Sequence, residues 1–139
     1  MCEFDWAGLA LKQYLYDSCD RARMAFSKQI SEEGLQRILQ LMEREEKVHL
    51  EHWSEWVRLM ARNEQGRIYL QEALENLYPL IADFFADPGY VQVQKHYNLP
   101  ETSGEILMRQ CLREVDEFLK NHGLSIPLPY SGMAERLTH

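Results

Sequence analysis

The chain has 139 residues, enough for one domain with a hydrophobic core and too few for two domains of ordinary size. Acidic residues outnumber basic ones by 22 to 15, and the formal net charge of −7 argues against nucleic acid or an anionic membrane as a partner. The longest apolar runs fall far short of the roughly 20 residues that span a bilayer, and the N-terminus lacks the pattern of a secretion signal.

The cysteine pattern is typical of a protein in a reducing compartment. Cys2, Cys19 and Cys111 are odd in number, and their spacing fits neither a disulfide framework nor a thiolate zinc site. We therefore expect a cytoplasmic protein with reduced thiols.

The hydrophobic pattern predicts an all-α protein that begins with a long helix pair at about residues 4–62. The first helix is expected from about Phe4 to Lys28, because small and apolar residues recur there every three to four positions. Ser31 is a favourable N-cap for the second helix, which continues for about 31 residues, or roughly 46 Å. Helices of this length are typical of a bundle.

Two further helices and an irregular tail complete the predicted single domain of residues 1–139. A third helix is expected over about residues 66–86 and a fourth over about 102–122, with Thr102 and Glu105 forming a capping box. We expect an irregular connection between these helices. Residues 123–139 are rich in proline and glycine, so the tail is also expected to be irregular.

Two polar residues interrupt the apolar stripe of the second helix. Continuing from Met42 in steps of three and four leads to Glu46 and His49 before Trp53 is reached. Burying an unpaired carboxylate and imidazole would cost several kcal/mol. A Glu-x-x-His pair that faces the inside of a helical bundle is the arrangement by which ferritin-like proteins hold two iron or manganese ions.

The first helix offers the additional carboxylate that such a site needs. Asp17 lies about as far from the connecting turn as Glu46 does, so the two residues are expected at nearly one level of an antiparallel pair. The alternative is that Asp17 pairs with Arg21 on a solvated face. Asp20 is a second candidate on the same helix.

Other neighbours of His49 leave further ligand pairs open. Glu45 with His49, or His49 with His52, could supply the ligands instead, although Glu45 and His52 turn away from the stripe and are expected in solvent. Glu45 could also support the site from outside the ligand set.

Three sequence runs carry a resemblance to a known family. Asp5-Trp6-Ala7, Tyr14-Leu15-Tyr16-Asp17 and Glu45-Glu46-Lys47-Val48-His49 resemble the C-terminal half of the catalytic-type subunits of the phenylacetyl-CoA epoxidase, a ferritin-like bacterial multicomponent oxygenase family. The resemblance implies metal ligands at Asp17, Glu46 and His49. It also implies diiron chemistry that activates oxygen for the oxidation of coenzyme A thioesters, and so a monooxygenase of phenylacetate catabolism.

The chain departs from that family in length and in its number of ligand motifs. A complete family subunit is about twice as long and has a second helix pair with its own carboxylate and Glu-x-x-His, whereas this chain has one such pair. A homodimer would complete the four-helix bundle and bring two copies of Asp17, Glu46 and His49 around one dinuclear centre. A separate chain that supplies the missing helix pair is the heteromeric alternative.

These patterns lead to one principal hypothesis and two alternatives. We expect a dinuclear metalloprotein, with iron as the metal and manganese as the alternative, that oxidises an organic substrate and needs no organic cofactor. Other oxygenase or reductase subunits are expected partners. The alternatives are a non-catalytic structural subunit of such an oxygenase and an iron-oxidising or iron-storage protein.

Overall fold

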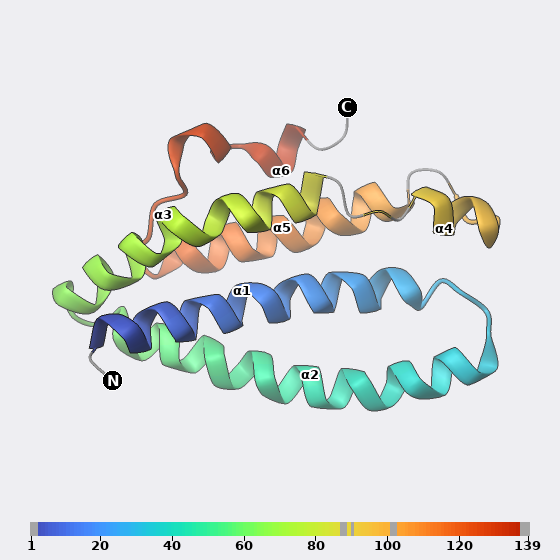
Figure 1. The fold of residues 1–139 in the computed structure, drawn as a ribbon, viewed down its shortest axis with the longest axis horizontal. Helices are drawn as coiled ribbons and strands as arrows, with labels where there is room; N and C mark the ends of the chain where they lie inside the picture. Colours follow the sequence, from blue (N-terminus) through green and yellow to red (C-terminus); the bar gives the residue numbers. More distant parts are fainter. Residues whose placement is uncertain (1–2, 87–88, 90, 101–102, 137–139) are drawn as a thin grey trace.

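The computed structural model describes residues 3–86, 89, 91–100 and 103–136, and in these residues every regular element is helical (Figure 1). The elements in chain order are α1 (Glu3–Ser27), α2 (Glu33–Met60), α3 (Glu64–Ala86), α4 (Val91–His96), α5 (Ser103–Asn121), a 3₁₀ turn η1 (Leu128–Tyr130) and α6 (Met133–Arg136). The all-α prediction is confirmed, and the four long helices lie where the sequence places them. No described helix is long and apolar enough to cross a membrane.

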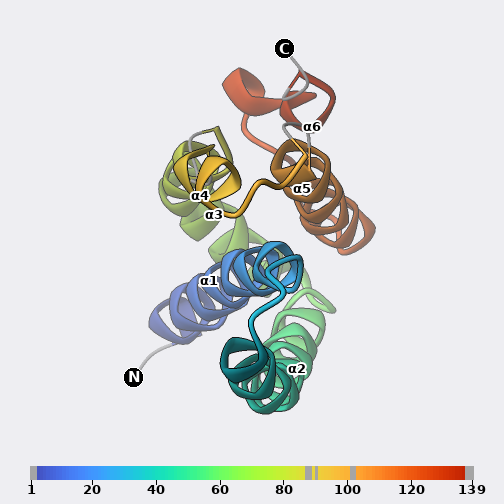
Figure 2. The same cartoon turned by 90° about the vertical axis from the view of Figure 1, so that its right-hand side faces the viewer.

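Helix α1 is the central element of the fold. It packs against α2 on one side and against α3 and α5 on the other, as the end-on view shows (Figure 2). The predicted apolar face of α1 is buried: Ala7, Leu11, Leu15 and Ala22 are fully inaccessible to solvent. Helix α2, by contrast, rests almost entirely on α1 and has little contact with the rest of the chain.

The core lies between α1, α3 and α5. Leu70, Leu74, Leu112 and Val115 are fully buried there, together with Tyr78. The Tyr78 hydroxyl donates a hydrogen bond of 2.7 Å to Oδ1 of Asp116, which satisfies two polar groups inside this core. The tail packs over α3 and α5, where Ala134 is buried and the ring of Tyr130 contacts that of Tyr78.

Two segments predicted to be irregular contain helices. Residues Val91–His96 form α4, in which Val93 and Gln94 both face the bundle; the alternation of a strand would have turned them to opposite sides. Oε1 of Gln94 accepts the backbone N–H of Gly104 at 2.9 Å, which caps the start of α5. The tail likewise contains η1 and α6. Thr102, the predicted cap, lies outside the described residues.

The turn between α1 and α2 differs from the prediction at its cap. Glu32, not Ser31, occupies the N-cap position of α2, and its side chain makes no capping hydrogen bond. The side-chain amide of Gln36 donates instead to the carbonyl oxygens of Ile30 and Lys28, at 2.6 and 3.2 Å, and closes the turn. The side chain of Gln36, in the first turn of α2, therefore takes the place of the predicted cap at Ser31.

Candidate metal centre

Three carboxylates meet where α1 faces α2. Asp17, Asp20 and Glu46 each place one oxygen so that these atoms all lie within 4.8 Å of one another. Asp17 and Asp20 are three residues apart and therefore share one face of α1, while Glu46 reaches them from α2. The structure thus brings together the predicted pair, Asp17 and Glu46, and adds Asp20 from the candidates left open.

This carboxylate cluster contains buried oxygens that lack a partner. Oδ2 of Asp17 and Oε1 of Glu46 are inaccessible to solvent and, when both carboxylates are ionised, have no hydrogen-bond donor among the described residues. Burial raises the pKa of Glu46 to about 7, and the negative charge of Asp17 adds to the rise. Burial also raises the pKa of Asp17, although the hydrogen bond that a protonated Glu46 would donate and the charge of His49 act in the opposite direction. Such a site is poorly satisfied by the protein alone.

The cluster has the properties that a hard divalent cation requires. Carboxylate oxygens are the usual ligands of manganese and of non-haem iron, and a bound cation would supply the partner that the two orphaned oxygens lack. The three ligand atoms are close enough together to share one cation. The residues present therefore fit a metal ion.

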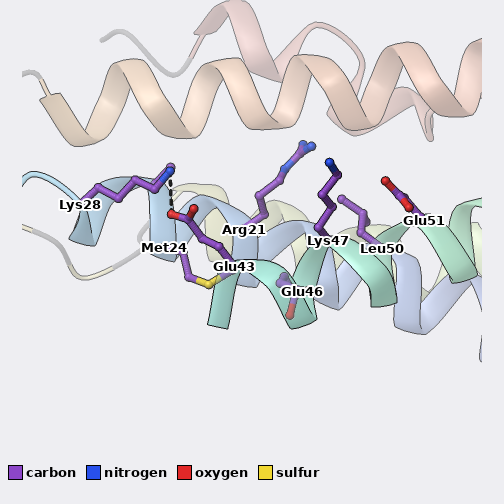
Figure 3. Close-up of a pocket in the computed structure, with 9 residues that line it drawn as sticks. Arg21, Met24, Lys28, Glu43, Glu46, Lys47, Leu50 and Glu51 are labelled. Carbon is purple, nitrogen blue, oxygen red and sulfur yellow. Dashed lines mark ion pairs between the residues drawn. The ribbon is translucent and has the colours of Figure 1, made fainter. Parts of the chain in front are cut away.

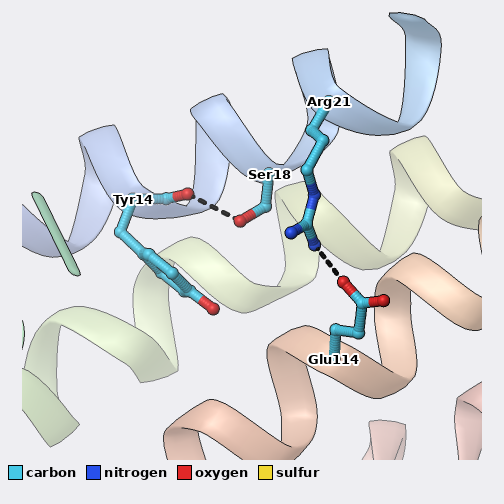
Figure 4. Close-up of polar contacts among 4 residues, drawn as sticks. All are labelled: Tyr14, Ser18, Arg21 and Glu114. Atoms are coloured by element: carbon cyan, nitrogen blue, oxygen red, sulfur yellow. Dashed lines mark hydrogen bonds and ion pairs between the residues drawn. The ribbon is translucent and has the colours of Figure 1, made fainter. Parts of the chain in front are cut away.

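Arg21 does not neutralise the cluster. Its guanidinium extends away from α2 and forms an ion pair of 2.5 Å with Glu114 on α5 (Figure 4). In the preceding turn, the Ser18 hydroxyl donates to the Tyr14 carbonyl oxygen at 2.9 Å, so it too bonds away from the carboxylates. The alternative in which Asp17 pairs with Arg21 is therefore not what the structure contains. Among the residues that the structure describes, Asp20 is the one member of the cluster with an ion-pair partner, Arg23 at 3.0 Å.

His49 lies beside the cluster but is exposed to solvent. The sequence predicts Glu46 and His49 together on a buried face, and only Glu46 is partly buried in this chain. The reason is that α2 turns its Leu39, Leu50 and Val57 side toward α1, and this side lies about 80–100° around the helix from the direction of His49. Glu45 and His52 are exposed as well, as predicted.

The face of α2 that carries His49 is apolar and has no neighbour in the described part of the chain. Ile38 and Met42 lie within about 40° of His49 around the helix, and their exposed fractions are 56% and 47%. Leu41 and Val48 lie farther around the same helix and are even more exposed. We call Ile38, Met42 and His49 the open stripe of α2. It is the half of the predicted apolar face that α1 does not cover.

Tryptophans join α1 and α2 beyond the cluster. The ring of Trp6 lies 6.0 Å from that of Trp53 and 5.0 Å from that of Trp56, centroid to centroid. Trp53 lies on the predicted stripe, and Trp6 belongs to one of the runs that carry the family resemblance, but the contact between them does not follow from the sequence pattern. The three rings hold the N-terminal part of α1 against α2 and so help to fix the level at which Asp17 meets Glu46.

Two cavities adjoin the cluster. One, of about 410 Å³, lies between α1 and α2 and is lined by Arg21, Met24, Ala25, Lys28, Glu43, Glu46, Lys47, Leu50 and Glu51 (Figure 3). In this cavity, the side chain of Glu46 points away from the charged ends of Arg21 and Lys47. The other, of about 360 Å³, lies between α1 and α3 and is lined by Asp20 and by mostly apolar neighbours, namely Tyr16, Cys19, Arg23, Leu80, Ile81 and Phe84.

Comparison with known proteins supports the resemblance found in the sequence. The model of a family described as "Phenylacetic acid catabolic protein" matches residues 2–138, which is nearly the whole chain. No curated protein and no solved structure matches the chain.

Proposed function

The chain belongs to the phenylacetic acid catabolic protein family, and we propose that it is a ferritin-like metalloprotein that uses oxygen to oxidise an organic acid derivative in phenylacetate catabolism. The single observation that carries this proposal is the meeting of Asp17, Asp20 and Glu46, with two buried carboxylate oxygens left without partners. Iron is the proposed metal, and manganese is the alternative.

The three carboxylates would have different roles in such a metal site. Asp17 and Glu46 would supply the buried carboxylates that hold and neutralise the metal, while Asp20 would act as a further ligand or would orient the others. When bound, iron in a carboxylate and histidine shell supplies redox chemistry toward oxygen. The protein contributes a fixed donor set and, through α1 and α2, a rigid frame for it.

The cavity between α1 and α3 is the proposed place for the organic substrate. Asp20 borders both this cavity and the carboxylate cluster, so a molecule held against Ile81 and Phe84 would lie next to the metal ligands. A volume of about 360 Å³ is suited to a small organic group. An oxygenase needs such a space, whereas iron storage does not.

A homodimer is the proposed form in which the site is complete. The chain has one Glu-x-x-His motif, and His49 lies on the open stripe of α2, next to exposed Ile38 and Met42. A second copy that covers the stripe would bury these apolar side chains and bring His49 into the interior, where it could join Glu46 as a ligand. Further oxygenase or reductase subunits would then bind this dimer.

Metal content of the native protein tests the metal site. We expect about one iron or manganese ion per chain by elemental analysis of the dimer fraction from size-exclusion chromatography. Glu46→Ala and His49→Ala should each abolish the bound metal while the helical circular dichroism is retained. His52→Ala is the matched control, because His52 is an exposed histidine on the same helix, one turn away, and should leave the metal content unchanged.

Equal metal content in all of these variants would refute the ligand assignment. The oxygenase assignment has its own test: iron-loaded protein, supplied with a reductant and a phenylacetyl thioester, should consume oxygen and yield a product one oxygen atom heavier by mass spectrometry. Oxygen uptake with iron(II) alone and no oxidised organic product would favour iron oxidation instead.

A charge placed on the open stripe tests the homodimer. Met42→Asp should convert the dimer to a monomer and reduce the metal bound per chain, because His49 would lose its enclosed position. Leu128→Asp is a matched control, since Leu128 is 88% exposed and lies in η1, far from α2 in sequence. A dimer that survives Met42→Asp would place the interface elsewhere.

The exposure of His49 also favours one competing function, that of a structural subunit. In that case His49 and its exposed neighbours would contact another oxygenase subunit, and the carboxylate cluster would bind no metal. Absence of metal after loading with iron(II) under anaerobic conditions would establish this alternative over the metalloprotein.

A further inference from the structure

Asp20 lies between two different parts of the molecule. One of its oxygens lies within 4.8 Å of oxygens of Asp17 and Glu46, which makes it part of the carboxylate cluster. Its Oδ1 also accepts a hydrogen bond of 3.0 Å from Nη1 of Arg23, and both residues line the cavity between α1 and α3. Each step of three residues turns by about 60° around a helix, so Asp17, Asp20 and Arg23 lead from the α2 side of α1 to its α3 side. Asp20 is therefore the point at which the cluster and this cavity meet.

Arg23 is held on its other side by an aromatic ring. The central carbon of its guanidinium lies 4.6 Å from the centre of the Phe84 ring, and Phe84 lines the same cavity. An exposed ion pair between residues three apart is weak, and so is a cation over an exposed ring. The Arg23 side chain is 62% exposed, so it can exchange either contact for water. The guanidinium thus spans from Asp20 to Phe84 through two contacts that other groups can replace.

A metal ion would compete with Arg23 for Asp20. Arg23 neutralises the Asp20 carboxylate and places a positive charge beside it, and both effects oppose the approach of a divalent cation. In the described part of the chain, neither Asp17 nor Glu46 forms an ion pair. The competition therefore concerns Asp20 alone, and it decides whether the cluster offers a metal two carboxylates or three.

An organic group in the cavity would compete for the other contact of Arg23. Leu80 and Ile81 line the cavity beside Phe84, so a neutral apolar group held there would rest against the Phe84 ring. It would take the place of the guanidinium on that ring. Arg23 would then keep one weak partner, and Asp20 would become available to a metal ion.

We propose that Arg23 is a positioning residue that links the cavity between α1 and α3 to the carboxylate cluster. It occupies Asp20 while the Phe84 ring is uncovered, and it releases Asp20 to the metal ion when an organic group covers that ring. This inference rests on the metal site and the substrate cavity of the proposed function. A metal ion and a neutral organic molecule would each strengthen the binding of the other, and by the same factor.

Titration of the metal-free protein with manganese(II), with and without benzyl alcohol, tests the proposal. Manganese is one of the two proposed metals, and benzyl alcohol is a neutral aromatic molecule without a carboxylate that could itself bind the metal. Calorimetry at low ionic strength, at a pH above the raised pKa of Glu46, measures the dissociation constant of manganese. For the parent protein, we expect benzyl alcohol to strengthen manganese binding about threefold.

Replacement of Arg23 should remove this coupling. We expect Arg23→Gln to bind manganese about threefold more tightly than the parent does without benzyl alcohol, and to gain nothing further when it is added. Arg23→Lys retains the charge beside Asp20 and should restore the affinity of the parent. In an Asp20→Asn background, Arg23→Gln should change nothing, because the ion pair is already absent. Arg37→Gln is the matched control, since Arg37 forms an exposed ion pair with Glu33 within α2 and should leave the affinity unchanged.

The outcomes distinguish this inference from the proposed function. Weaker or unchanged manganese binding by Arg23→Gln would overturn the inference, as would an equal effect of benzyl alcohol on this variant and on the parent. An equal gain in the Asp20→Asn background, or from Arg37→Gln, would reduce the effect to net charge and overturn it as well. Absence of manganese binding by the parent would overturn the proposed function and this inference together. Arg23 is exposed, so its replacement should leave the fold intact, which an unchanged circular dichroism spectrum verifies.

Discussion

The hydrogen bond between Tyr78 and Asp116 links α3 to α5 inside the core, and its removal by Tyr78→Phe should destabilise the protein in a pH-dependent way. Tyr78 is fully buried and Asp116 is 8% exposed, so water cannot easily replace the lost hydroxyl. A buried hydrogen bond to a charged acceptor contributes on the order of 2 kcal/mol. For a chain of this length, that loss corresponds to a melting temperature lower by about 7 °C.

The sign of the pH dependence follows from the pKa of Asp116. Burial raises this pKa above its usual value, while the hydrogen bond from Tyr78 and the charge of Lys120 lower it and Glu135 raises it. A carboxyl whose folded-state pKa is raised contributes stability at low pH that is lost as the pH rises through that pKa. Tyr78→Phe removes one of the lowering influences, so the variant should lose more stability over this interval than the parent protein.

Urea unfolding followed by circular dichroism at pH 4.5 and 7.5 measures the effect. We expect Tyr78→Phe to cost about 2 kcal/mol at the higher pH, and less at the lower pH, where a larger fraction of Asp116 is protonated. In an Asp116→Asn background the same substitution should cost about 1 kcal/mol at both. Each comparison is a difference in the free energy of unfolding between two variants at one pH, so the contribution from titration of the carboxylate cluster cancels. An equal cost at both pH values in the parent background would refute this reasoning.

The remaining predictions concern packing, thiols and metal. Gly66→Ala should destabilise the protein by at least about 2 kcal/mol in urea unfolding, because the added Cβ would lie 1.8 Å from the Met60 carbonyl oxygen. Gly34→Ala, an open helical position, should instead leave the stability unchanged or raise it by up to about 1 kcal/mol. In a Cys2→Ser background, iodoacetamide should label Cys19 and Cys111 only after unfolding, because both are buried and burial raises the pKa of Cys19 to about 12. Rapid labelling of the folded protein, measured by mass spectrometry, would contradict that burial. Chelation of the metal-loaded protein should lower its melting temperature in calorimetry by leaving Asp17 and Glu46 without a buried cation, and an unchanged melting temperature would argue against a metal at this site.

The sequence by itself determined where the four long helices lie along the chain. It also determined which side of a helix is buried, wherever the hydrophobic pattern and the packing of the helices agree. The positions of α1, α2, α3 and α5 follow from helical periodicity, and the meeting of Asp17 with Glu46 follows from their equal distance from one turn. The family was recognisable from the same ligand motif. These features depend on spacing along the chain, which the sequence contains directly.

Only the tertiary structure decided which part of the α2 stripe is buried. Periodicity gives the direction of an apolar face to within a broad arc, and α1 covers one edge of that arc, which leaves Ile38, Met42 and His49 exposed. Likewise, Arg21 could have paired with Asp17 on its own helix, but α5 offers Glu114, and the carboxylate cluster remains without that cation.

Helix α4 and the turn between α1 and α2 depended on tertiary contacts as well. The side chain of Gln94 holds α4 against the start of α5, in a segment that has no strong hydrophobic pattern. The side chain of Gln36 closes the turn between α1 and α2, where Ser31 was expected to cap the second helix. The sequence specifies which helices form, and the relative placement of those helices specifies which of their side chains share a site.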